Sequence, residues 1–123
     1  MGYETKLVVV NKTNQVHDIN GERMVWAEKI AEFNLCKVHE ISDRMRRYPT
    51  TNAFYYADDG NTEVVEDQCG DRLREIPLLD AINIIDWAIR TQDYYRRYSP
   101  CLELLKGFNP SAWADLVVLH YGY

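Results

Sequence analysis

Residues 77–97, PLLDAINIIDWAIRTQDYYRR, form the stretch on which the predicted fold depends. Apolar residues occupy almost every side of a helix drawn through its first half, which is typical of a helix at the centre of a domain. Pro77 suits the first turn of a helix, where its missing N–H group costs nothing. Burial of the six Leu and Ile side chains in this stretch would contribute on the order of 10 kcal/mol before chain entropy is counted.

The helix is predicted to end at Ser99-Pro100, because a proline inside a helix removes a hydrogen bond and clashes with the preceding turn. A second, shorter helix is predicted for PCLELLKGF (residues 100–108). Ser99 suits its N-cap, and Gly107 marks its end.

Both ends of the chain are predicted to be strands. Residues 3–10, YETKLVVV, alternate apolar and polar side chains and then become β-branched. Residues 115–123, DLVVLHYGY, contain an unbroken apolar run, which is typical of a strand covered on both faces. A short extended piece is also expected at residues 73–76, immediately before Pro77.

Two secondary structures remain open for residues 24–38, MVWAEKIAEFNLCKV. As a helix, the segment places Trp26, Ile30 and Phe33 on one stripe. As a strand, it alternates apolar residues and would pair with the first strand across a turn at Asn20-Gly21.

The clearest local signal is the hairpin predicted for residues 53–67, AFYYADDGNTEVVED. Asp59-Gly60 favours a type I′ turn, in which both central residues have positive φ. Aromatic residues then face β-branched or acidic residues across the hairpin, a favourable arrangement for cross-strand pairs. The expected pairs are Tyr56 with Glu63, Tyr55 with Val64, and Phe54 with Val65.

Strand and helix blocks are segregated along the chain, which indicates an α+β fold. We expect a single domain over residues 1–123, since this length is typical of one domain. Its architecture should be a mostly antiparallel sheet of about four to five strands with two helices packed on one face.

Composition narrows the classes of function. The net charge of -5 argues against a general nucleic-acid binder, which is usually basic. Three widely spaced cysteines, an odd number, argue against a secreted disulfide framework and favour reduced thiols in the cytoplasm. Neither a signal peptide nor a membrane-spanning run is recognisable, so no membrane partner is expected.

Two clusters of arginine and tyrosine are the candidate binding residues. The first lies in a basic, polar connection predicted for residues 43–51, and the second lies at the end of the long helix. The second cluster also has a purely structural interpretation, because arginines complement the dipole at a helix C-terminus and tyrosine rings cover core edges. If the clusters meet in space, they would suit a protein interface, phosphates or stacked bases. Their members are Arg44, Arg46, Arg47 and Tyr48 in the first cluster, and Tyr94, Tyr95, Arg96, Arg97 and Tyr98 in the second.

Motifs for catalysis, cofactors and metals are not found. The sequence has no P-loop, GxGxxG or GxSxG pattern, and its three histidines form no ligand motif. The acidic stretch DDGNTE does not match the spacing of a calcium loop. We therefore expect no cofactor, and we assign no catalytic or metal-binding residue. The hypothesis that ranks last is an enzyme whose catalytic groups come together only in the folded structure. Its candidate groups are Cys69, His120 and the pair Asp58/Asp59.

Two quoted segments carry a family resemblance. GYETKL near the N-terminus and YYADDGNTEVVEDQCGDRLREIP in the middle resemble small uncharacterised proteins encoded by phages and prophages. The resemblance covers about half of the chain and includes no catalytic motif. It implies an intracellular protein that acts on host or phage components during infection.

These observations rank the hypotheses on function. The first is a small intracellular interaction protein without catalytic activity, such as a phage accessory protein or a host-directed inhibitor, with a protein partner or self-association. The second is a nucleotide or nucleic-acid binding module that uses both Arg/Tyr clusters to hold phosphate. Whether these clusters lie on one face of the molecule is the observation that would separate a site from a helix terminus.

Overall fold

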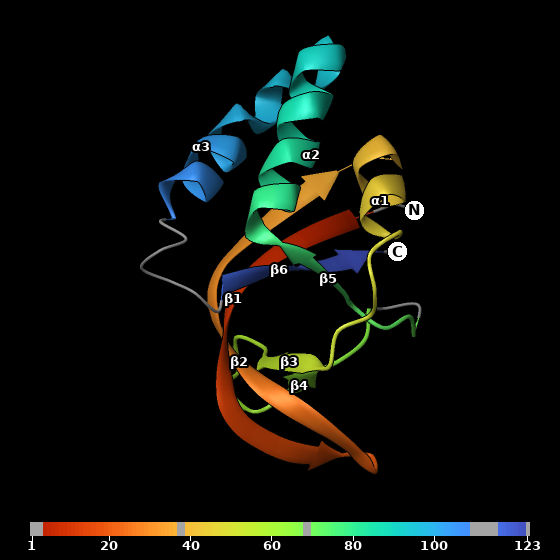
Figure 1. The fold of residues 1–123 in the computed structure, drawn as a ribbon, viewed down its shortest axis with the longest axis vertical. Helices are drawn as coiled ribbons and strands as arrows, with labels where there is room; N and C mark the ends of the chain where they lie inside the picture. Colours follow the sequence, from red (N-terminus) through yellow and green to blue (C-terminus); the bar gives the residue numbers. More distant parts are fainter. Residues whose placement is uncertain (1–3, 37–38, 68–69, 109–115, 123) are drawn as a thin grey trace.

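The computed structural model describes residues 4–36, 39–67, 70–108 and 116–122 and has an α+β fold (Figure 1). Its strands are β1 (Glu4–Ile19), β2 (Glu22–Cys36), β3 (Ala53–Tyr56), β4 (Glu63–Val64), β5 (Arg74–Pro77) and β6 (Leu116–Gly122). Its helices are α1 (His39–Met45), α2 (Leu78–Thr91), the 3-10 helix η1 (Asp93–Tyr98) and α3 (Ser99–Gly107). The strand order is β4-β3-β2-β1-β6-β5, in which β2 and β3 pair in parallel and the other neighbours are antiparallel. The sheet is thus mostly antiparallel as predicted, but it has six strands, and α1 was not predicted.

The long β1–β2 hairpin resolves the ambiguity over residues 24–38 in favour of a strand, which the structure describes as far as Cys36. Asn20 and Gly21 form the turn, with φ angles of 53° and 84°. Positive φ at both central residues is the type I′ geometry, whose twist matches that of the flanking strands. Register shifts between Val9 and Val10 and between Lys12 and Val16 interrupt the ladder. Such bulges bend a strand, and Figure 1 shows the hairpin curving around β3 and β4.

The two ends of the sheet meet and close it into a barrel-like shape. The N–H of Thr51, just before β3, donates to the carbonyl of Leu73 at 2.9 Å, and Thr50 bridges to Arg74 of β5. Beyond β4, Glu66 forms a second bridge, to Arg72. These bonds pair edges that would otherwise be open, which is how small sheets avoid unsatisfied backbone groups.

Closure of the sheet creates two hydrophobic cores, one on each of its faces. Leu7 and Val9 of β1 belong to the core beneath the helices, whereas Val8 and Val10 belong to the core on the concave side. All four side chains are fully buried. The strand β6 lies between β1 and β5 and is covered on both faces, as predicted from its apolar run.

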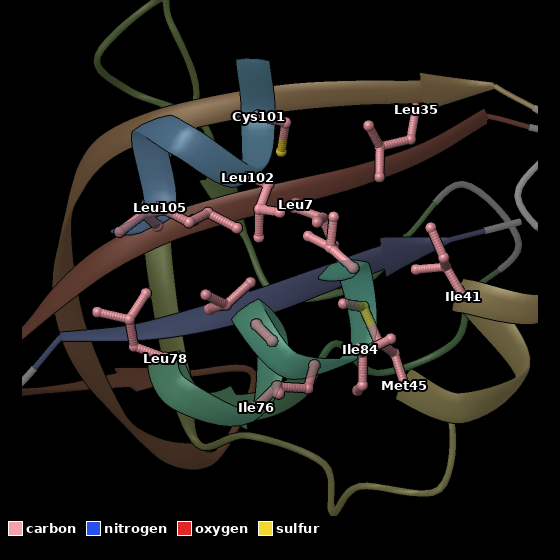
Figure 2. Packing of buried hydrophobic residues seen from close by; sticks show 14 of the residues in the cluster. Leu7, Leu35, Ile41, Met45, Ile76, Leu78, Ile84, Cys101, Leu102 and Leu105 are labelled. Atoms are coloured by element: carbon pink, nitrogen blue, oxygen red, sulfur yellow. The ribbon is translucent and has the colours of Figure 1, made fainter. Parts of the chain in front are cut away.

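Helix α2 lies on the outer face of the sheet between α1 and α3 (Figure 1). The helical core is formed by residues from α1, α2 and α3 and from β1, β2, β5 and β6 (Figure 2). Leu79 of α2 faces away from it and is 63% exposed, so α2 is not buried on every side. The labelled members in Figure 2 are Leu7, Leu35, Ile41, Met45, Ile76, Leu78, Ile84, Cys101, Leu102 and Leu105.

The predicted end of the long helix, at residue 97, is wrong. Helix α2 ends at Thr91, Gln92 is extended, and the chain continues as the 3-10 helix η1 rather than as an α-helix. Ser99 opens α3 without capping it, since its hydroxyl donates to the carbonyl of Arg96 at 2.8 Å. The end of α3 at Gly107 agrees with the prediction.

The β3–β4 hairpin has the predicted register but not the predicted turn. Tyr55 pairs with Val64 and Tyr56 with Glu63, whereas Phe54 and Val65 do not extend the ladder. Gly60 has a positive φ of 76°, but Asp59 does not belong to the positive-φ residues of the described chain. Asp59 instead accepts hydrogen bonds from the N–H groups of Asn61 and Thr62, both at 2.8 Å. This side-chain turn closes a longer loop than a type I′ turn allows.

Candidate functional site

Helix α1 carries Arg44 of the first basic cluster and leads directly into its other members, Arg46, Arg47 and Tyr48. Ile41 and Met45 are fully buried in the helical core. Ser42 is also buried, and its hydroxyl lies 2.8 Å from the hydroxyl of Thr5 on β1. These contacts fix the rotation of α1 about its axis. Residues 43–45, which were predicted to be part of a polar connection, are therefore helical because an apolar stripe docks on the core.

Arg44 and Tyr48 face α2. The guanidinium carbon of Arg44 lies 3.6 Å from the centroid of the Trp87 ring, which is the geometry of cation–π stacking. The hydroxyl of Tyr48 donates to Oδ2 of Asp80 at 3.0 Å. Burial raises the pKa of Tyr48, and the hydrogen bond to Asp80 and its charge raise it further, so this hydroxyl stays a donor at neutral pH.

Two adjoining hollows of about 320 Å³ and 310 Å³ lie along this contact. They share Arg44, Tyr48 and Ile84, so they form one continuous depression between the two helices. We call this surface the α1–α2 groove. It is lined by Arg44, Arg47, Tyr48, Pro49, Asp80, Asn83, Ile84 and Trp87.

The second predicted cluster lies in η1. Arg96 and Arg97 are exposed there, and the guanidinium carbon of Arg97 lies 5.0 Å from the centroid of the Tyr98 ring. Tyr98 also packs against the helical core. The side chains of Tyr94 and Tyr95 lie outside the described part of the chain. Figure 1 shows α1 on one side of α2, with η1 and α3 on the other side. The helix α2 thus runs between the two predicted clusters.

Arg46 lies apart from the other members of its own cluster. It lines a separate cavity of about 120 Å³ next to β6, together with Arg74 and His120. The predicted first cluster is therefore divided between two hollows: Arg44, Arg47 and Tyr48 line the groove, and Arg46 lines this small cavity.

A larger hollow of about 560 Å³ opens on the concave side of the sheet. Its cations already have partners: Nζ of Lys29 lies 2.5 Å from a carboxylate oxygen of Asp58, and Nζ of Lys6 lies 5.1 Å from the Tyr121 ring centroid. Glu32 and other acidic residues also line it. The hollow is thus polar and acidic, and it does not favour an anionic ligand.

The described residues do not bring the candidate catalytic groups together. Asp58 lines the concave hollow, whereas His120 shares the opposite, helix-side face of the sheet with Val118. Asp59 is committed to its own turn, whose hydrogen bonds from Thr62 and Asn61 lower the pKa of its carboxyl group. Cys69 lies outside the described residues.

Within the described ranges, no group of three or more His, Cys, Asp or Glu side chains is placed to hold a metal ion. Among the helices in the same ranges, none is both long enough and apolar enough to span a membrane.

Sequence reasoning did not assign Trp87 and Asp80 to a site, because both were visible only as parts of the long helix. It named His120 only as a member of the catalytic hypothesis. The available signal was the spacing of Ile41 and Met45, four residues apart, which indicates a short helix with one apolar face.

Comparison of the chain with protein-family models, with curated proteins and with solved structures finds no match. The assignment of function therefore depends on the geometry of the sites.

Proposed function

We propose that this chain is a small interaction protein that acts without catalysis, by binding a partner protein at the α1–α2 groove. The observation that supports it is the Arg44–Trp87 stack beside the Tyr48–Asp80 hydrogen bond. Arginine, tyrosine and tryptophan are the residues that most often carry the binding energy of protein interfaces. Here their side chains are already held in place, which lowers the entropy cost of association.

The groove also defines the chemistry of the partner. Ile84 forms an apolar floor, and Arg44 and Arg47 outnumber the single aspartate on its walls. The exposed guanidinium of Arg47 has no partner among the residues that the structure describes. A segment that offers an apolar or aromatic side chain beside a carboxylate would fill the floor and pair with Arg47.

The resemblance to phage and prophage proteins supplies the proposed setting. In that setting the protein is an accessory factor or an inhibitor that binds a component of the host in the cytoplasm. Cys101 is a buried free thiol, and burial raises its pKa to about 12. An unreactive, reduced thiol of this kind is consistent with a cytoplasmic protein.

Site-specific photo-crosslinking tests the proposal. A benzophenone amino acid replaces Asn83, an exposed residue of the groove, and in a control protein it replaces Gln15, an exposed residue of β1. We expect a bacterial lysate to yield one crosslinked protein from position 83 that position 15 does not capture. Equal products from both positions, or none from position 83, would contradict the proposal.

The captured partner then allows a quantitative test. Arg47→Glu reverses a charge in the groove, and Arg23→Glu makes the same change at an exposed position of β2. Loss of at least 1.4 kcal/mol, or about tenfold in Kd, is expected for Arg47→Glu and not for Arg23→Glu. Equal affinities of the two variants in titration calorimetry would place the interface elsewhere.

Phosphate recognition is the second candidate function, with a nucleotide or nucleic acid as ligand. The exposed guanidinium groups of Arg96 and Arg97 in η1 favour it, and the net charge of -5 weighs against it. Fluorescence polarisation with labelled single-stranded oligonucleotides should show binding that weakens with salt and with the double change of Arg96 and Arg97 to alanine. Polarisation that stays flat at low salt would remove this candidate.

A further inference from the structure

A buried histidine near the end of β6 lines the small cavity that also contains Arg46. His120 is 3% exposed, and its Nε2 atom has no hydrogen-bond partner among the described residues. Most buried polar atoms in proteins are paired, so an unpaired imidazole nitrogen needs an explanation. One explanation is a ligand that completes the site.

The cavity beside this histidine is about 120 Å³ in volume. At roughly 30 Å³ per water molecule in the liquid, it can hold several waters or one tetrahedral oxyanion. It is lined by Arg46, Asp67, Asp71, Arg72, Arg74, His120 and Gly122. Cations therefore outnumber carboxylates on its walls.

Two of these arginines have N–H groups that can donate hydrogen bonds to a bound anion. The guanidinium of Arg46 has no partner in the described part of the chain, and it is close enough to His120 to affect its titration. Arg74 lies opposite His120 in the β5–β6 ladder. It donates from Nη1 to the carbonyl of Tyr48 at 3.1 Å, which leaves its other N–H groups available.

Two other charged groups of the wall, Arg72 and Asp67, are already engaged, and the Asp71 carboxylate also lines the cavity. Arg72 donates to Glu22 at 2.6 Å. Asp67 accepts from the N–H of Asp71 at 3.0 Å. These bonds fix the positions of Arg72, Asp67 and Asp71 beside the cavity.

Gly122 shapes the floor of the cavity. A Cβ atom added at this residue would lie 2.5 Å from Cε1 and 3.0 Å from Nε2 of His120. The imidazole ring can therefore lie over the backbone here only because residue 122 has no side chain.

We propose that this cavity binds a small tetrahedral oxyanion of the sulfate or phosphate class, held by the guanidinium groups of Arg46 and Arg74 and by Nε2 of His120. Charge-assisted hydrogen bonds from arginine are the usual means of holding such groups. The anion satisfies the unpaired nitrogen and neutralises the two arginines that face it.

A bound anion also changes the titration of His120. In the free protein, burial and then the charges of Arg46 and Arg74 lower the pKa of His120 to about 4. The other charged groups that line the cavity around His120 are the carboxylates of Asp67 and Asp71 and the guanidinium of Arg72. An anion opposes the effect of the arginines, so it raises this pKa, and by linkage it binds more tightly as the pH falls.

The test is an NMR titration of the imidazole groups with sodium sulfate, with sodium chloride added to hold the ionic strength constant. Sulfate keeps both charges across mildly acidic and mildly alkaline pH, so any pH dependence of its binding comes from the protein. We expect a saturable shift of the His120 signals, tighter binding at the lower pH, and little change at His17, which is exposed.

Arg46→Gln should weaken this binding about tenfold or more, since one charge-assisted hydrogen bond is lost. Arg23→Gln is the matched control, because it removes the same charge from an exposed position of β2 and should leave the affinity unchanged. Both arginines are exposed, so neither variant is expected to unfold the protein.

A parallel titration with phenyl phosphate identifies the source of the anion. Tighter binding than that of inorganic phosphate indicates a phosphorylated ligand, and weaker binding indicates a free anion. A His120 shift that grows linearly with sulfate, or equal affinities in the Arg46 and Arg23 variants, would overturn the proposal. His120 would then be a neutral core histidine whose Nε2 is hydrated.

Discussion

Truncation of one isoleucine on α2 tests the packing that supports both sites. Ile85 is fully buried between α2 and the sheet, whereas Leu79, on the same helix, is 63% exposed. Replacing Ile85 with alanine removes buried carbon atoms and leaves a cavity, a change that costs about 2–5 kcal/mol in protein cores. Replacing Leu79 with alanine removes contacts mainly with water and should cost less than about 1 kcal/mol.

The expected difference is large enough to measure by several methods. Unfolding entropy of about 2.1 cal/mol/K per residue gives roughly 0.26 kcal/mol/K for a chain of 123 residues. A loss of about 3 kcal/mol in Ile85→Ala therefore lowers Tm by roughly 12 °C. Urea titration followed by tryptophan fluorescence and by far-UV circular dichroism provides the free energy of unfolding.

The comparison is controlled within one helix. Alanine has a higher helix propensity than either residue, so this small gain acts in the same direction in both variants. A cost below about 1 kcal/mol for Ile85→Ala, or equal costs for the two variants, would refute the assigned faces of α2.

Three further predictions concern closure, turn geometry and pH. Thr51→Val should cost about 1–3 kcal/mol in urea titration, because the N–H of Ala53 and the carboxylate of Glu75 both lose their bonds to the Thr51 hydroxyl; unchanged stability would argue against closure there. Gly21→Ala should cost about 1–2 kcal/mol, since φ is 84° at this residue, whereas no cost would argue against the type I′ turn. Because the pKa of His120 falls from 6.5 to about 4 on folding, the unfolded chain binds this proton first, and up to ~3 kcal/mol of stability is lost as the pH falls from 6.5 to 4. His120→Gln should lack this part of the loss; parallel pH curves for the two proteins would contradict it.

The parts of the fold that depend on local patterns were predictable from the sequence. Asn20-Gly21 specifies a tight turn, and the strand alternative for residues 24–38 required only that turn. The register of β3 and β4 followed from the position of Gly60. The burial of β6 on both faces followed from its unbroken apolar run.

The parts that depend on distant contacts were not predictable. The parallel pairing of β2 with β3 and the bond from Thr51 to Leu73 join segments separated along the chain. Neither leaves a periodic signal, because each involves only a few backbone groups. The end of α2 at Gln92 also lacked a signal, since neither proline nor glycine lies there.

The position of α1 explains why the sequence indicated the candidate site only in part. Arg44, Arg46 and Tyr48 are almost adjacent in the chain, so they were treated as one cluster. The burial of Ile41, Met45 and Ser42 sets the rotation of α1 about its axis. Neighbouring arginines on either side of that apolar stripe must then face different surroundings.

Those surroundings give the two arginines different chemistry. Arg44 lies on the indole ring of Trp87, beside the Tyr48–Asp80 hydrogen bond, which suits a protein-binding surface. Arg46 lines a small cavity with a buried imidazole and a second guanidinium, and its own guanidinium has no partner among the described residues. The two proposals can therefore succeed or fail separately, because Arg47→Glu changes the groove and Arg46→Gln changes the small cavity. Loss of the Thr5–Ser42 hydrogen bond, which helps to hold α1, is expected to impair both.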